Sequence, residues 1–270
     1  MENQPDALLQ QLISMMAQLR HPETGCDWDK KQNFHTIAPF TLEETWEVLD
    51  AISRENKPDL RDELGDLLFH ILFYARLAEE ESSFDFQAIC QSLREKLIRR
   101  HPHLFSAGEG AGTVSPLPWQ QIKQREREAN KMTSLLQGIP EMFPALLRAE
   151  KIQLRCHAVG FDWDNIEQVL AKVHEEIDEV MEEAQRSSID PLRLEEEVGD
   201  LLFATVNLAR HLGQNAEQAL AKANNKFIGR FQQVEQRLAQ QQLTPDCATL
   251  EQMEHAWHWV KQTEKQSSSQ

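Results

Sequence analysis

The 270-residue chain has little of what builds a β-sheet, a membrane span or a disulfide framework. It contains 10 glycines, 11 prolines and one tyrosine, whereas the helix formers Leu, Glu, Gln and Ala are abundant. No apolar run approaches the ~18 residues of a membrane span, and the first residues do not have the pattern that predicts a signal peptide. The four cysteines lie far apart without a CxxC pair, which favours reduced thiols in a cytoplasmic protein over a zinc site.

Basic side chains are also scarce. The chain has 28 of them against 44 acidic ones, a net charge of −16. Because a nucleic-acid polymer is bound through a basic face, such a polymer is not expected as the main partner. A small phosphorylated ligand held through a metal ion stays compatible with this charge. The composition predicts an all-α protein that does not bind membranes.

The chain repeats itself in order. The segment Gly25–Asp29 (GCDWD) recurs as Gly160–Asp164 (GFDWD), and Glu63–Phe69 (ELGDLLF) recurs as Glu197–Phe203 (EVGDLLF). Repetition on this scale indicates a duplicated structural unit. We therefore expect two tandem helical domains.

The expected domains comprise residues 1–131 and 132–270. In the first, we predict helices over 41–54, 58–80 and 85–100, then a loop over 106–118 and a helix from Trp119 to about Lys131. In the second, we predict helices over 166–186, 192–212, 216–240 and 249–261. Thr41 with Glu44 has capping-box spacing, and Asp190 before Pro191 suits a helix start.

Each repeat carries two pairs of carboxylates spaced three residues apart, and residues three apart share a helix face. If the two helices pack antiparallel, four carboxylates converge. The two quartets are Glu44, Glu47, Glu63 and Asp66, and Glu176, Glu179, Glu197 and Asp200. Each aspartate is followed by an almost wholly apolar segment, so its surroundings should be buried and an unpaired charge costly. Oxygen ligands so arranged favour Mg²⁺, with Mn²⁺ as an alternative. The other interpretation, a solvated acidic face, suits neighbours such as Glu43 and Glu175.

Basic and aromatic residues supply candidate substrate ligands. Lys222, Lys226 and Arg230 are spaced four residues apart and suit a polyphosphate, although a surface stripe paired with glutamates is the simpler interpretation. The first repeat has Ser92, Lys96 and Arg100 at these positions, so one cation is missing there. Lys172 and Trp257 complete the set of candidates. The indole of Trp257 either stacks on a base or anchors the core.

Together these motifs resemble the MazG family of nucleoside triphosphate pyrophosphohydrolases. The resemblance rests on an ExxE motif, a spacer of 15 or 17 residues and an ExxD motif in each repeat, on GxDWD, and on the tandem arrangement. It implies tandem helical-bundle domains of the all-α NTP pyrophosphatase type that form a homodimer. It also implies Mg²⁺-dependent hydrolysis of NTPs and dNTPs to NMP and pyrophosphate, in nucleotide-pool house-cleaning or regulation. A regulatory protein partner is left open.

The mechanistic hypothesis places catalysis in the second repeat. Its quartet would coordinate Mg²⁺ and lower the pKa of a bound water, which attacks the α-phosphorus. Either a quartet carboxylate or Glu175 would position that water. Lys222, Lys226 and Arg230 would neutralise phosphate charge, and Trp257 would close over the nucleotide. Because a cation is missing at Ser92, the first repeat is expected to be a weaker, regulatory or assembly site.

Three other functions compete with this one. A scaffold protein with acidic docking helices would need no Mg²⁺ and would turn nothing over. A di-iron carboxylate bundle normally carries ExxH on its ligand helices, and this chain has no such motif. A relative that cleaves phosphoribosyl-ATP or dUTP alone would share the metal chemistry and differ in the base pocket.

Overall fold

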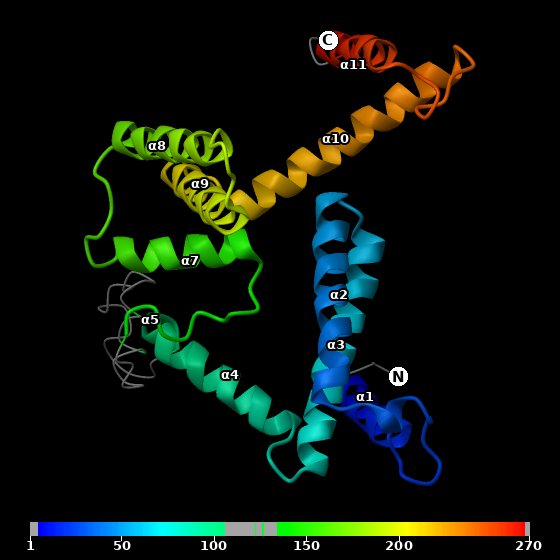
Figure 1. Ribbon diagram of the computed structural model, residues 1–270. Helices are drawn as coiled ribbons and strands as arrows, with labels where there is room; N and C mark the ends of the chain where they lie inside the picture. Colours follow the sequence, from blue (N-terminus) through cyan, green and yellow to red (C-terminus); the bar gives the residue numbers. More distant parts are fainter. Residues whose placement is uncertain (1–4, 106–121, 123–125, 127–133, 268–270) are drawn as a thin grey trace. The chain divides into compact units, whose positions relative to one another are not determined.

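The computed structural model describes residues 5–105, 122, 126 and 134–267. Residues 5–105 and 134–267 form ten α-helices, one 3-10 helix and no strand, which confirms the predicted all-α class. The chain divides into two compact units, Met1–Pro118 and Trp119–Gln270. Each unit is built around a pair of adjacent helices (Figure 1).

The first unit is centred on the hairpin of α2 (Phe34–Ser53) and α3 (Lys57–Glu80), joined by a short turn. Helix α1 packs on α3, and its Met16 joins Ile37 of α2 and Leu72, Phe73 and Leu77 of α3 in one buried core. The remaining elements are α1 (Pro5–Leu19), η1 (Asp29–Lys31), α4 (Phe86–Arg100) and α5 (Pro102–Phe105).

The second unit repeats this plan. Helices α8 (Ile166–Ala184) and α9 (Pro191–His211) form the hairpin, and α7 (Ala145–His157) packs on α9 as α1 packs on α3. Helix α10 (Ala216–Ala239) is followed by α11 (Leu250–Ser267), and a second apolar cluster is buried between these two helices. The cluster consists of Val234, Leu238, Ala256 and Val260.

Side-chain caps determine where the hairpin helices begin. Asn33 Oδ1 accepts hydrogen bonds from the backbone N–H groups of His35 (2.9 Å) and Thr36 (3.1 Å), and Thr36 Oγ1 accepts one from the Asn33 N–H (2.8 Å). This capping box begins α2 at Phe34. The predicted start at Thr41 is therefore wrong: Thr41 lies inside the helix. The predicted start of α9 is confirmed, because Asp190 caps the helix and Pro191 lies in its first turn.

Several predictions on the linking segment lie outside the described residues. They are the loop over 106–118, the helix from Trp119 to Lys131 and the domain boundary between residues 131 and 132, which stays a prediction. Within the described part of the chain, no helix combines the length and apolarity that crossing a bilayer requires.

Candidate functional site

The hairpin of the second unit brings three predicted acids together. One oxygen each of Glu176, Glu179 and Glu197 lies within 4.8 Å of the others. Glu176 is only 4% exposed, and Glu197 is half-buried. Asp200 follows one turn after Glu197 on α9 and is exposed, outside this group of three.

Lys172 serves this cluster as an internal cation. Its Nζ lies 2.7 Å from Glu176 Oε1 and 3.0 Å from Glu175 Oε1, and these hydrogen bonds raise the pKa of Lys172. The second oxygen of Glu176, Oε2, is buried and has no hydrogen-bond partner. Burial, and then the negative charge of Glu176, raise the pKa of Glu179. One lysine cannot neutralise all of these carboxylates. The cluster therefore keeps excess negative charge and a buried acceptor, which suits a divalent cation.

The first unit gathers a matching cluster. One oxygen each of Glu44, Glu63 and Asp66 lies within 4.8 Å of the others. Burial and then the neighbouring carboxylates raise the pKa values of Glu44 and Glu63. Glu47 is exposed and lies outside the group of three, although its charge contributes to both shifts. The repeat position of Lys172 is Phe40, so this cluster has no lysine on the preceding turn.

A polar triad lies one turn from the first cluster, and the sequence analysis missed it. Thr41 Oγ1 is 2.7 Å from His70 Nδ1 and 2.7 Å from Tyr74 Oη. His70 is buried, which lowers its pKa. The equivalent positions in the second unit hold Val173, Ala204 and Leu208. The sequence could have indicated this triad, because three positions that are apolar in the second repeat are all polar in the first.

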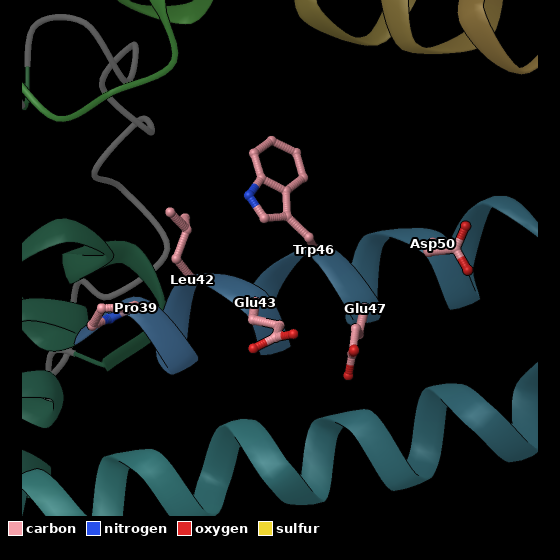
Figure 2. A pocket seen from close by; sticks show the side chains of 6 residues that line it. All are labelled: Pro39, Leu42, Glu43, Trp46, Glu47 and Asp50. Atoms are coloured by element: carbon pink, nitrogen blue, oxygen red, sulfur yellow. The ribbon is translucent and has the colours of Figure 1, made fainter. Parts of the chain in front are cut away.

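Helix α2 also carries an open hollow of about 550 Å³, and every residue that lines it comes from this one helix. Figure 2 shows Leu42 and Trp46 on the side of α2 away from α3, while the Glu47 carboxylate lies on the side toward α3. Leu42, Trp46 and Leu49 are 53%, 45% and 45% exposed. Among the described residues of the first unit, no element other than α2 lines this hollow.

The predicted basic residues lie mainly on α10 and α4. Lys222 and Lys226 are exposed on α10. Arg230 Nη2 instead pairs with Glu264 Oε2 of α11 at 2.7 Å, and its guanidinium lies 6.0 Å from the Trp257 ring centre. Trp257 packs against Phe227 and the apolar cluster between α10 and α11, so it contributes to the core. Lys96 and Arg100 are half-buried on α4.

The repeated GxDWD motif anchors a loop in the second unit. Both Asp162 carboxylate oxygens lie 2.7 Å from Arg210 Nη2, and Oδ1 lies 3.0 Å from His211 Nε2. Burial alone would raise the pKa of Asp162, but the hydrogen bonds from Arg210 and His211 outweigh it and lower the pKa to about 2. The ionised carboxylate thus ties the loop 158–165 to the end of α9.

Comparison with known proteins identifies relatives over almost the whole chain. The model of the MazG nucleotide pyrophosphohydrolase domain matches twice, at residues 32–105 and 164–235. The nucleoside triphosphate pyrophosphohydrolase of Escherichia coli strain K12 is 54% identical over 95% of this chain and 98% of its own.

A second relative is the nucleoside triphosphate pyrophosphohydrolase/pyrophosphatase MazG of Thermotoga maritima. It is 39% identical over 94% of this chain and 96% of its own. A crystal structure of a mazG-related protein from Thermotoga maritima matches 44% of this chain and 98% of its own, at 24% identity and a TM-score of 0.34.

Proposed function

The chain belongs to the MazG nucleotide pyrophosphohydrolase family and is an enzyme of that class, and on this premise we propose that it hydrolyses NTPs and dNTPs to NMP and pyrophosphate. The proposal includes dependence on Mg²⁺, with Mn²⁺ as an alternative, and a role in nucleotide-pool house-cleaning. The observation that carries it is the buried Glu176 at the centre of three converging carboxylates, with one oxygen unpartnered.

The acidic cluster of the second unit would hold the metal ion. Glu176, Glu179 and Glu197 supply oxygen atoms close enough for one ion, and Asp200 lies on the next turn of α9. Carboxylate oxygens are the ligands that Mg²⁺ and Mn²⁺ prefer. When bound, such an ion supplies positive charge that neutralises a triphosphate and polarises its phosphoryl oxygens. Glu44, Glu63 and Asp66, with Glu47 beside them, would form the equivalent site in the first unit.

Lys172 has three roles in this proposal. Its ammonium group holds the Glu176 carboxylate in place at 2.7 Å. Its second contact, with the exposed Glu175, orients a carboxylate at the edge of the cluster. Either Glu175 or a carboxylate of the cluster would accept a hydrogen bond from the attacking water. Lys172 is also a candidate ligand for a phosphate oxygen.

The α10 residues would bind the phosphates. Lys222 and Lys226 are exposed and present positive charge to an anionic ligand. Arg230 would exchange its contact with Glu264 for a phosphate oxygen, and Trp257 beside it would cover the nucleotide. Lys96 and Arg100 would serve the first unit in the same way.

A homodimer and a cytoplasmic location complete the proposal. The exposed stripe of Leu42, Trp46 and Leu49 on α2 borders a hollow that, within residues 5–105, is lined by α2 alone, which suits coverage by a second copy. The four cysteines are free thiols, which suits a reducing compartment.

The test is a panel of ribo- and deoxyribonucleoside triphosphates, incubated with and without Mg²⁺, with the products identified by ion-exchange chromatography. NMP and pyrophosphate should form only with the divalent ion, and Asp200→Asn should lower the rate on the order of 100-fold. Glu196→Gln, an exposed neighbour on α9, is the matched control and should keep its rate. Products of NDP and phosphate, or near-normal turnover by a folded Asp200→Asn protein, would contradict the proposal.

A further inference from the structure

The first unit contains an open groove of about 530 Å³ between α1, α3 and the beginning of α4. Its floor is apolar and buried, because Met16 of α1 and Leu72 and Ala75 of α3 are only 3–4% exposed. The volume lies in the range of ligand-binding sites. Exposed polar side chains and one thiol border the opening, namely Gln10 and Ser14 on α1 and Asp85, Gln87 and Cys90 on α4.

The second unit closes the equivalent space. The repeat positions of Met15 and Asp85 are Glu150 on α7 and Asn215, the cap of α10. Asn215 Nδ2 donates a hydrogen bond to Glu150 Oε2 at 2.7 Å, which ties α10 to α7. An ionised aspartate can only accept, and a methionine side chain has no strong acceptor, so Asp85 and Met15 cannot make this contact. The groove between α1 and α4 is therefore a feature of the first unit.

The second unit is hollow at another place. A cavity of about 500 Å³ lies there between α7, the loop 158–165 and α9, and its lining includes Gln153, Phe203 and Asn207. The first unit has Phe73 at the position of Asn207, and this ring is fully buried in the core. The groove of the first unit therefore does not simply repeat this cavity.

The charges beside the groove leave one carboxylate without a counterion. Arg76 pairs with Glu79 at 3.0 Å and with Glu80 at 2.8 Å, and Glu80 also pairs with Arg20 at 2.7 Å. These four side chains balance one another. Asp85 is exposed, caps α4 through Oδ1 and forms no ion pair with any residue that the structure describes. An apolar floor beside an unpaired carboxylate suits a ligand that carries apolar side chains and a positive charge.

We propose that this groove docks a helical segment of a partner protein, with an apolar face on the floor and a basic side chain on Asp85. The α1 wall extends from Gln10 to Ala17, roughly 10 Å or two helical turns. A groove of this length accommodates side chains spaced as i and i+4 on an amphipathic helix, which is a recurrent mode of recognition. The first unit would thus serve as a docking module, whether or not its acidic cluster hydrolyses nucleotides.

The first test uses Cys90, whose exposed thiol lines the groove. In the full-length chain with serine at Cys26, Cys156 and Cys247, the rate at which a maleimide modifies Cys90 is measured. A synthetic amphipathic helix with a leucine face and lysine flanks should slow this reaction saturably. The same peptide with glutamate in place of lysine should protect far less. Equal protection by both peptides would overturn the proposal. A thiol that is unreactive without peptide would also overturn it, because another segment or a second copy would then cover the groove.

The second test locates the binding by fluorescence anisotropy of the labelled lysine peptide on the full-length chain. Ser14→Trp fills the groove and should lower the affinity on the order of 10-fold. Asp85→Asn keeps a good helix cap but removes the charge, and should lower the affinity about 3-fold. The matched control is Glu95→Gln, an exposed change on α4 outside the groove lining, which should have no effect.

Thermal melting verifies that each variant is folded. Because Asp85→Asn is a mild change, it keeps the test decisive even if Ser14→Trp fails to fold. Peptide affinity that stays the same in the folded groove variants, or that falls equally in Glu95→Gln and Asp85→Asn, would overturn the proposal.

Discussion

At the scale of single residues, the two acidic clusters differ in how their charge is balanced. In the second unit, Lys172 offsets part of the negative charge of the cluster. Because Lys172 pairs with Glu176, that carboxylate can be buried to 4% exposure. In the first unit Phe40 takes the place of Lys172, and the corresponding Glu44 is half-buried. Charge balance and burial thus change together between the repeats.

The raised pKa of Glu179 predicts how stability depends on pH and metal. A carboxyl group whose pKa is raised on folding stabilises the protein fully below its unfolded value, 4.5, and this contribution is lost as the pH rises through the folded pKa. In EDTA, Glu179→Gln should therefore melt at the wild-type temperature near pH 4 and above it at pH 7. With Mg²⁺ at pH 7 the order should reverse, because the variant has lost a ligand. Circular dichroism melting curves from pH 4 to 8 measure both effects.

Glu196→Gln again provides the matched control, since Glu196 is an exposed carboxylate on α9 outside the cluster. It should show neither the pH trend nor the reversal by metal. A Glu179→Gln protein whose melting difference stays constant over this range would contradict the charge-crowding explanation.

At the scale of elements, regular periodicity was enough to predict the hairpin helices of both units, but not where α2 begins. The familiar capping spacing pointed to Thr41 and Glu44, while the structure uses Asn33 and Thr36. Thr41 faces His70 and Tyr74 of α3 instead, and such a partner 29 or 33 residues away cannot be identified from local spacing. Thr41 is a residue type that often caps helices, but its hydroxyl makes a tertiary contact instead.

Removal of the observed cap should loosen the beginning of α2. Asn33→Ala is expected to cost about 1 kcal/mol, because two backbone N–H groups lose their acceptor. Hydrogen exchange of the His35 and Thr36 amides should become faster. Asn33→Asp keeps the acceptor and should exchange at the wild-type rate. If Thr41→Val, rather than Asn33→Ala, accelerated exchange at these amides, the assigned start of α2 would be wrong.

At the scale of the whole molecule, duplication made the acidic residues easy to find and the cavity of the second unit hard to find. Two copies of each carboxylate pair stand out in a single sequence, since both repeats need them at the same spacing. Gln153 is paired with the backbone of Phe203, 50 residues away, and this contact can be recognised only once α7 lies on α9. Contacts that differ between repeats leave no repeated signal.

The two units should contribute unequally to turnover in the full-length chain. Glu179→Gln is expected to lower kcat/KM for ATP on the order of 100-fold, because it removes a carboxylate from the cluster of the second unit. The equivalent change in the first unit, Glu47→Gln, should cause a much smaller loss. Steady-state pyrophosphate release by both variants makes the comparison. A larger loss from Glu47→Gln would make the first unit the main catalyst.

The contrast between Phe73 and Asn207 reaches beyond this chain. One position in each half records whether the interior of that copy is filled or hollow, so alignments of tandem relatives can be sorted by the pair of residues found there. Lineages with an aromatic ring in one half and a small polar residue in the other would have divided the labour after duplication.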